Sequence, residues 1–474
     1  MTSAASVFRA FDQYPEDTGS NQQCDNAIIS NNNKTPATDG TATRLDRIEN
    51  CQKLFTPKFQ KSTKNNPLCG ICLPEWLSIL KKRWRHIEWT VYWPRLLFVT
   101  MLSILNSLLG LMDHFLYGRR IADTEIHPRP VFILGHPRTG TTLLQSLLAL
   151  DIERFAICST FCAGFPSSFL SIEAVGKIVF RGVIDDHRPM DNVPLGFDLP
   201  QEDELATNVM SAGISPYMPL FFMKQEPEFR PYYAFDDNAI GDERLEASVM
   251  ASARKQWTDA FLTLMRKLTV REEKQRTGTT TTAVSSQRRR LLLKSPVHTA
   301  RIPLLLQLFP NAQFIYIHRH PYDVLRSAMH MADTTYWYTY LNTPTDEQIM
   351  EFILRQYEIL FDRYEAGRKQ ILSTTQNQVL VEVSFDELSQ NPIETVRRVY
   401  SELGWTMKPT MEASLQTDLA DIKAYQRNSH RELSPQLKRI VNERWGPSFE
   451  RFGYEMDRVK IEDEKKDPSD RNFD

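Results

Sequence analysis

The chain has 474 residues, of which 41% are hydrophobic and 24% are charged, so it is long enough to bury a sizeable core in one large domain or two smaller ones. Its 57 basic and 59 acidic residues give a formal net charge of −2, which excludes a global positive field for binding nucleic acid. A mean hydropathy of −0.40 excludes a many-pass membrane protein, and six scattered cysteines exclude a secreted disulfide scaffold. The first residues show no basic stretch followed by an apolar run, so we expect no secretory signal and a cytoplasmic or membrane-associated protein.

The first segment of the chain, residues 1–72, is predicted to be a disordered leader. It is rich in Asn, Thr, Ser, Asp and Lys, and its apolar residues follow no sustained period. Such a segment offers too little apolar surface to offset the entropy lost on ordering.

The composition changes at Leu73, where a helical segment rich in Trp and Lys, residues 73–122, is predicted. Four of the eight tryptophans lie within 18 positions, and an uncharged run of 17 residues, 96–112, follows them. Three interpretations stay open: a helix on the domain core, a helix of residues 76–112 lying on a membrane surface, and a spanning helix, which requires about 20 apolar residues.

Residues 123–458 alternate between short apolar runs and helical periodicity, which predicts a parallel sheet covered by helices on both faces. The expected strands are Val131–Leu134, Leu291–Leu293, Phe314–Ile317 and Val379–Val383. The expected helices are Thr141–Leu150, Ala300–Phe309, Tyr322–Met331 and Pro392–Leu403. The fold class is therefore α/β, with a P-loop-like sheet and a helical N-terminal segment. A low-complexity surface insertion is expected at residues 271–290, and a charged tail at 459–474.

The most informative stretch is VFILGHPRTGTTLL, from Val131 to Leu144. A predicted strand runs into Gly135, the chain turns as far as Gly140, and a helix follows. Glycines allow a tight turn whose amide groups point into one concavity, and the start of the helix adds partial positive charge. This arrangement favours a turn that binds a phosphate or a sulfate over a surface turn that binds no ligand.

The same stretch departs from the nucleotide-triphosphatase pattern G-x-x-x-x-G-K-[ST] at one position. Gly135, Gly140 and Thr142 fit the pattern, but Thr141 occupies the lysine position. That lysine contacts the β- and γ-phosphates, so its absence argues against NTP hydrolysis or kinase chemistry. A guanidinium inside the loop, that of Arg138, can instead form paired hydrogen bonds with an oxyanion.

A second cluster lies in the stretch FIYIHRHPYDVLRSA, residues 314–328. Arg319 lies at the carboxyl end of a predicted strand, and Ser327 lies two turns into the helix that follows. Ligands of parallel sheets bind beyond the carboxyl ends of the strands, so both side chains can converge on one phosphate.

Together the two clusters resemble the sulfotransferase family that uses 3′-phosphoadenosine 5′-phosphosulfate (PAPS). The loop HPRTGTT resembles the 5′-phosphosulfate loop of its P-R-[ST]-G-T-T branch, and Arg319 and Ser327 resemble its 3′-phosphate site. The likeness covers residues 123–457 in order and includes five further segments: Arg188–Asn192, Pro200–Glu204, Leu293–His298, Val383–Pro392 and Phe449–Tyr454. It implies a sulfotransferase that converts PAPS to 3′-phosphoadenosine 5′-phosphate (PAP) and needs no metal. The donor-binding residues it implies are Pro137, Arg138, Thr139, Gly140, Thr141, Thr142, Arg319, Ser327 and Arg427.

The resemblance also implies catalytic roles. Arg138 would neutralise the leaving phosphate, and Lys294, at the end of a predicted strand, would contact the bridging oxygen. Transfer to an alcohol needs a base, for which we select Glu202 from three adjacent carboxylates, although these also suit the acidic first turn of a helix. The remaining candidates for the base are Asp203, Glu204, His136, His187 and His298.

The acceptor is expected to be a small-molecule or lipid-like alcohol, because the Trp-rich segment is apolar. Two other functions remain open: a P-loop kinase or NTPase, and a non-catalytic anion-binding module associated with a membrane. Mg²⁺-dependent ATP turnover would favour the former, and PAP binding without transfer would favour the latter.

Overall fold

The computed structural model describes residues 54–185, 187, 195–236, 246–277, 288–373, 379–423 and 432–457. A single sheet with five parallel strands organises this part of the chain. In spatial order the strands are β2 (Phe155–Ile157), β3 (Arg290–Lys294), β1 (Val131–Leu134), β4 (Gln313–His318) and β5 (Leu380–Ser384). The four predicted strands therefore lie within one residue of observed ones at each end, and the predicted α/β class is confirmed.

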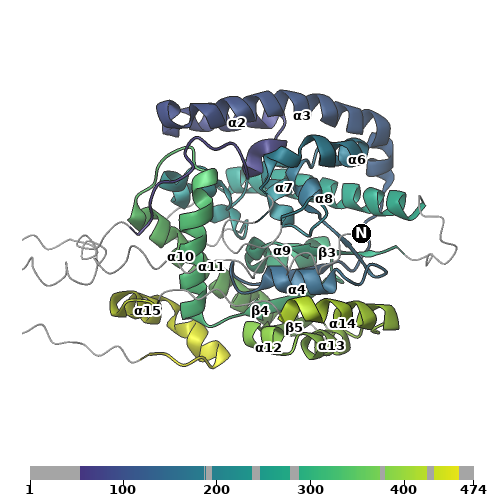
Figure 1. Ribbon diagram of the computed structural model, residues 1–474, viewed down its shortest axis with the longest axis vertical. Coiled ribbons are helices and arrows are strands. Elements are labelled where there is room, and N and C mark those ends of the chain that lie inside the picture. The colour runs from purple at the N-terminus through teal and green to yellow at the C-terminus, as the bar shows by residue number, and fades with distance from the viewer. Residues whose placement is uncertain are drawn as a thin grey trace, which may run out of the picture.

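Helices cover both faces of this sheet (Figure 1). The α-helices of the domain are α4 (Thr141–Leu148), α5 (Thr160–Gly164), α6 (Phe169–Val179), α7 (Asp203–Met210), α8 (Ala247–Thr277), α9 (Ile302–Leu308), α10 (Pro321–Thr335), α11 (Asp346–Ser373), α12 (Phe385–Gln390), α13 (Pro392–Glu402), α14 (Pro409–Lys423) and α15 (Pro435–Phe452). Short 3₁₀ turns connect them at η5 (Arg181–Val183), η6 (Met218–Leu220), η7 (Met223–Tyr232), η8 (Pro296–Arg301) and η9 (Tyr336–Tyr338).

The alternation of side chains along β1 shows how the two faces are filled. Phe132 and Leu134 pack into a core with α5, α8 and α9, whereas Val131 and Ile133 pack into another with α4, α13 and α14. Successive strand residues point to opposite faces, so a fully apolar strand supplies both cores at once. The carboxyl ends of the strands thus form an edge between two layers of helices.

The N-terminal part forms an additional helical layer over the domain (Figure 1). It consists of η3 (Pro67–Gly70), α2 (Leu73–Arg83), η4 (Trp84–His86) and the long α3 (Trp89–Asp123). This confirms the predicted helical N-terminal segment. Helix α3 packs on α2, α6 and α8.

Two predicted boundaries require correction. The expected leader, residues 1–72, does not extend to its predicted end, because Phe55, Leu68 and Ile71 are buried in the core. The expected insertion at 271–290 is also too wide, since α8 continues to Thr277 and Arg290 is buried in β3. In both segments scattered apolar or long charged side chains pack on the domain without a periodic signal in the sequence.

Candidate active site

The turn between β1 and α4 has an unusual backbone. Gly135, Arg138 and Gly140 have positive φ values of 143°, 75° and 98°. A Cβ atom on Gly135 would lie 2.5 Å from the carbonyl oxygen of Ile317, and one on Gly140 would collide with the Phe385 ring. Both glycines are therefore required by close approach as well as by conformation. Arg138 is a non-glycine residue in the left-handed region of the backbone. Such residues are uncommon in proteins, and they cluster at active sites and ligand-binding turns.

The polar groups of this turn are divided between holding its shape and facing a ligand. The Gly135 amide donates to the Thr299 hydroxyl at 2.8 Å, and the Thr139 hydroxyl donates to the carbonyl oxygen of His136 at 2.7 Å. The amides of Thr141 and Thr142 open α4, where the geometry of a helix supplies no acceptor. The start of α4 is therefore able to bind an anion.

His136 does not serve as a base in this arrangement. Its ring is buried against Tyr357, with ring centroids 4.9 Å apart, and Nδ1 lies 2.7 Å from the carbonyl oxygen of Pro137. Burial lowers the pKa of His136 to about 3, so the ring is neutral at physiological pH. It supports the turn from behind.

The two anion-binding clusters of the sequence meet in space. The Nε atom of Arg138 donates to the Ser327 hydroxyl at 2.9 Å, and Nη1 of Arg319 donates to the carbonyl oxygen of Arg138 at 3.3 Å. Ser327 lies on α10, and Arg319 follows β4, the neighbour of β1 in the sheet. Two guanidinium groups and one hydroxyl are thus collected at one end of the sheet.

Lys294 and Glu202 form an ion pair beside this cluster. Nζ of Lys294 lies 2.8 Å from a Glu202 carboxylate oxygen and 3.4 Å from the Thr142 hydroxyl. The Lys294 side chain is only 2% exposed, whereas that of Glu202 is 23% exposed. Tyr217 donates a hydrogen bond to the second Glu202 oxygen. Burial, and then the negative charge of Glu202, raise the pKa of Tyr217 well above its ordinary value, so its phenol stays protonated.

The two neighbouring carboxylates are oriented away from this pair. Asp203 lies 2.6 Å from Nε2 of His298, and Glu204 accepts two hydrogen bonds from Arg301, at 2.6 and 3.1 Å. All four side chains are fully buried. Burial alone would raise the pKa of Asp203, but His298 and the surrounding hydrogen bonds lower it below its ordinary value. Asp203 and Glu204 also form the acidic first turn of α7, with Glu202 as the N-cap residue, so they anchor α7 to the domain.

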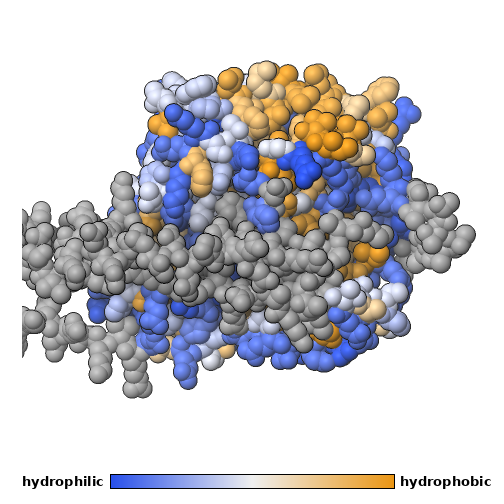
Figure 2. Space-filling model, viewed as in Figure 1, coloured by the Kyte–Doolittle hydropathy of each residue, from blue (hydrophilic) through white to orange (hydrophobic). Residues whose placement is uncertain are grey.

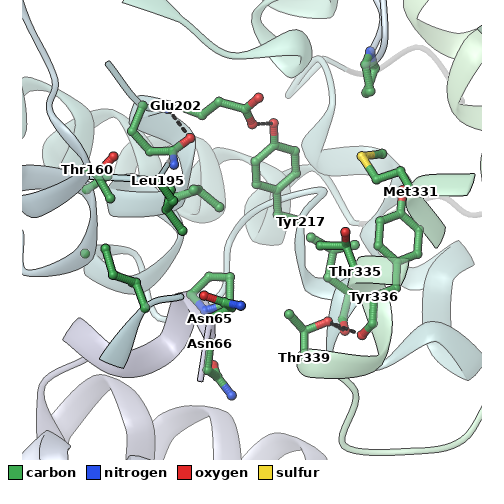
Figure 3. A pocket seen from close by; sticks show the side chains of 18 of the residues that line it. Asn65, Asn66, Thr160, Leu195, Glu202, Tyr217, Met331, Thr335, Tyr336 and Thr339 are labelled. Carbon is green, nitrogen blue, oxygen red and sulfur yellow. Dashed lines mark hydrogen bonds between the residues drawn. The ribbon is translucent and has the colours of Figure 1, made fainter. Parts of the chain in front are cut away.

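A cavity of about 270 Å³ opens in front of Glu202 (Figure 3). Figure 3 shows the Glu202 carboxylate turned toward the Tyr217 hydroxyl, with Met331 and Tyr336 on the opposite wall. Arg138, Thr141 and Thr142 close the end next to the anion-binding turn. The rest of the lining is mainly apolar and includes Pro67, Ala163, Phe165, Val183, Ile184, Leu195, Phe197, Leu205, Leu220 and Phe352.

Some residues of this site had no signal in the sequence. Tyr217 lies between two turns with no recognisable motif, and Asn65 and Asn66 come from the segment expected to be a disordered leader. The segment 336–340 contributes Tyr336 and Thr339 to the wall. Of the remaining candidates, His298 is buried with Asp203, His187 is exposed, and Arg427 lies outside the described residues.

Metal ligation has no candidate within the part of the chain that the structure describes. No group of three or more His, Cys, Asp or Glu side chains there could hold a metal ion. Cys69, Cys158 and Cys162 are buried, and burial raises the pKa of each thiol, which keeps all three protonated. The polar groups of the site therefore belong to the anion-binding turn and to the Glu202–Lys294 pair.

Comparison with known proteins gives one consistent result. The sequence model of the sulfotransferase family matches residues 130–409. The omega-hydroxy-beta-dihydromenaquinone-9 sulfotransferases Stf3 of Mycobacterium bovis and Mycobacterium tuberculosis are each 31% identical over 363 residues, which cover 77% of this chain and 85% of the relative.

Two solved structures are similar in fold. Sulfotransferase STF1 from Mycobacterium tuberculosis has a TM-score of 0.51 at 16% identity and covers 79% of this chain and 92% of its own. Sulfotransferase STF9 from Mycobacterium avium has a TM-score of 0.50 at 16% identity and covers 76% of this chain and 85% of its own. At this identity the two structures support the fold alone.

Proposed function

This chain belongs to the sulfotransferase family, and from that premise we propose that it transfers the sulfuryl group of PAPS to a hydroxyl group of an apolar, lipid-like acceptor. One observation carries the proposal. The anion-binding turn and the Glu202–Lys294 pair lie at the same end of an apolar cavity. A charged donor and an uncharged acceptor can therefore meet at Glu202.

The donor would be held at two points. The turn from Pro137 to Thr142 would bind the 5′-phosphosulfate through its amides and the Arg138 guanidinium. Arg319 and Ser327 would bind the 3′-phosphate from the neighbouring strand and helix. Arg138 donates a hydrogen bond to the Ser327 hydroxyl, and Arg319 donates one to the carbonyl oxygen of Arg138. The two parts of the donor site therefore belong to one connected network.

Sulfuryl transfer demands positioning and charge neutralisation. The sulfur–oxygen bond to the phosphate breaks while a new bond forms to the acceptor oxygen, so negative charge grows on the leaving phosphate. Lys294 contacts Thr142 of the turn, so its ammonium would lie next to that charge when the donor is bound. Glu202 would take the proton of the acceptor hydroxyl. Lys294 and the protonated Tyr217 hold the two carboxylate oxygens in place for this role.

The acceptor class follows from the walls of the cavity. Apart from Glu202 and the turn, the lining is mostly aliphatic and aromatic, which favours a molecule with one polar end and an apolar body. The Stf3 relatives are named for a hydroxylated menaquinone derivative, an acceptor of this kind. The rival activity, phosphoryl transfer from ATP, has no support at Thr141, where a triphosphatase would carry lysine.

A transfer assay tests the proposal. Full-length protein is incubated with ³⁵S-labelled PAPS and four acceptors: an omega-hydroxylated isoprenoid quinone, a sterol, a simple sugar and a tyrosine-containing peptide. We expect label on the quinone or the sterol, and at least about 100-fold slower labelling with Glu202→Gln. Label only on the sugar or the peptide would contradict the acceptor class. Mg²⁺-dependent ATP turnover without sulfuryl transfer, or PAP binding with no transfer at all, would contradict the activity.

A further inference from the structure

Helix α3 exposes an apolar face to solvent, where an ordinary surface helix exposes a polar one. Its outer face is a continuous row of large apolar side chains at helical spacing: Leu97, Met101, Ile104, Leu108, Leu111 and Phe115. The exposed fractions of the last three are 62%, 65% and 88%. No charged residue interrupts the helix between positions 96 and 112. Contiguous apolar surface of this size marks a contact with another phase or another molecule.

The inner face of α3 carries buried polar side chains beside the core residues Tyr92, Leu96 and Val99. Arg95 donates to the carbonyl oxygens of Ser62, Phe59, Trp337 and Tyr340, and Asn106 donates to those of Cys69 and Ile71. Asp113 accepts the amides of Leu170 and Ser171 and pairs with Lys267 at 2.9 Å. A helix that left the domain to cross a bilayer would strand all these groups without partners, at a high cost in free energy. The contacts therefore fix the helix to the domain at Arg95, Asn106 and Asp113, which argues against a membrane span.

Helix α6 extends the same apolar surface. It packs beside α3 and exposes Val175, Ile178 and Val179. Figure 2 shows hydrophobic residues gathered along the edge of the molecule formed by α3 and α6. The chain then continues through η5 to Val183 and Ile184, which line the cavity in front of Glu202. The apolar surface and the wall of the cavity are thus joined by one short segment.

The rim of this surface is aromatic and basic. Trp84 of η4 and Trp89 and Trp93 at the start of α3 are exposed, and the exposed Lys81 and Lys82 precede them at the end of α2. Arg119 and Arg120 are exposed near its end. Tryptophan prefers the headgroup depth of a bilayer, and basic side chains are attracted to anionic lipid. An interface with a protein would instead carry hydrogen-bonding groups about every 100–200 Å².

We propose that the outer face of α3 and α6 binds peripherally to the surface of an anionic lipid bilayer, with α3 parallel to the membrane plane. Apolar side chains enter the acyl boundary, and the tryptophans and basic residues lie at the headgroups. Resting on the proposed function, this orientation brings the cavity wall at Val183 and Ile184 next to the membrane, so a lipid-like acceptor enters from the bilayer.

Vesicle sedimentation tests the docking. Full-length protein is mixed with vesicles of phosphatidylcholine containing phosphatidylglycerol, and the sedimented fraction is measured. The triple variant L108E/L111E/F115E is expected to lose binding by at least about tenfold, because three exposed apolar side chains that would enter the acyl boundary become charged. The matched control is Leu372→Glu, since Leu372 is 61% exposed on α11, away from this face. PAP affinity and the thermal midpoint are expected to stay unchanged in both variants, which separates loss of docking from loss of the fold or of the donor site.

Two further measurements fix the geometry. Brominated acyl chains are expected to quench the tryptophan emission of the wild type, since the exposed tryptophans all lie in this segment and the remaining five are buried. An alkaline carbonate wash is expected to release the protein from the vesicles. Retention after that wash would overturn peripheral docking in favour of a span.

Two outcomes would overturn the membrane as the partner. One is equal sedimentation of the wild type and the triple variant. The other is a wild-type dimer that does not bind vesicles and that becomes a monomer in the triple variant. Sulfuryl transfer to a soluble alcohol reports on the proposed function independently of all these outcomes.

Discussion

Two ion pairs lie at the start of α7 and differ in their surroundings: the Glu202–Lys294 pair and the Glu204–Arg301 pair. Glu202 faces the cavity and is held by Lys294 and Tyr217. Glu204, two residues further on, is fully enclosed by Arg301, Ser215 and Trp257. Two glutamates only two positions apart can therefore have different roles. The one that faces the cavity is available to a substrate, and the one that faces the interior stabilises the fold. The difference predicts that substitutions in the two groups separate activity from stability.

The largest effect is expected on the enclosed side. Glu204→Ala leaves the Arg301 guanidinium buried without its carboxylate, which costs about 3–5 kcal/mol of the free energy of unfolding. Urea unfolding monitored by circular dichroism measures this loss. Glu204→Gln retains oxygen and shape and is expected to recover part of it. A Glu204→Ala variant as stable as the wild type would show that the enclosed pair does not hold α7.

On the cavity side, Glu202→Gln is expected to reduce kcat by about 10²–10⁴-fold, because the amide cannot take the acceptor proton. The amide oxygen still accepts from Tyr217 or Lys294, so the urea midpoint is expected to move little. Steady-state transfer assays measure kcat, and urea unfolding curves on the same preparation measure the midpoint, each relative to the wild type. Full activity in Glu202→Gln would remove Glu202 from the proposed role of base.

Tyr217→Phe removes the hydrogen bond from the Tyr217 hydroxyl to Glu202 and leaves the carboxylate in place. It therefore separates the positioning of Glu202 from its proposed role as the base. The expected loss in kcat is about tenfold, corresponding to one hydrogen bond of about 1–1.5 kcal/mol. PAP affinity is expected to be unchanged, since Tyr217 contacts Glu202 and not the turn. A loss as large as that of Glu202→Gln would instead assign Tyr217 a direct part in the reaction.

The smallest effect is expected in the pH dependence of stability. The pKa of Asp203 is lower in the folded protein than in the unfolded chain, so the folded state binds fewer protons. Its contribution is fully present above the unfolded pKa of about 3.9 and is lost as the pH falls through the folded pKa. Asp203→Asn is expected to flatten the acid side of the stability curve, measured as urea midpoints from pH 7 down to pH 3. An unchanged acid slope would show that the Asp203–His298 pair is not linked to folding.

The sequence predicted the strands and the anion-binding turn because both are local. Short apolar runs predict the strands, and the glycines of the turn are required by close contacts at Gly135 and Gly140. The convergence of Arg138 and Arg319 followed from the rule that parallel strands end at one edge. Their joint binding of PAPS, and the base role of Glu202, stay predictions.

Other features depend on contacts between distant segments. The sequence could not show that Tyr217 would reach Glu202, because no motif marks it. It also could not show which face of α3 would point outward: the inward face is selected by Arg95, Asn106 and Asp113, whose partners come from elsewhere in the chain. The ordered residues 54–72 escaped prediction for the same reason, since isolated apolar side chains such as Phe55 carry no period.

The donor site is tested most directly by titrating PAP by calorimetry into five proteins: wild type, Arg138→Ala, Arg319→Ala, Glu202→Gln and a control variant. The matched control, Arg397→Ala, removes solvent-accessible ion pairs from α13 to Glu394 of the same helix and to Glu412 of α14. We predict that both site arginine variants lose PAP affinity by at least about 100-fold, corresponding to one or more charge-assisted contacts, whereas Glu202→Gln and Arg397→Ala bind like the wild type. Wild-type affinity in Arg138→Ala or Arg319→Ala would contradict the assignment of this turn and strand end to the donor.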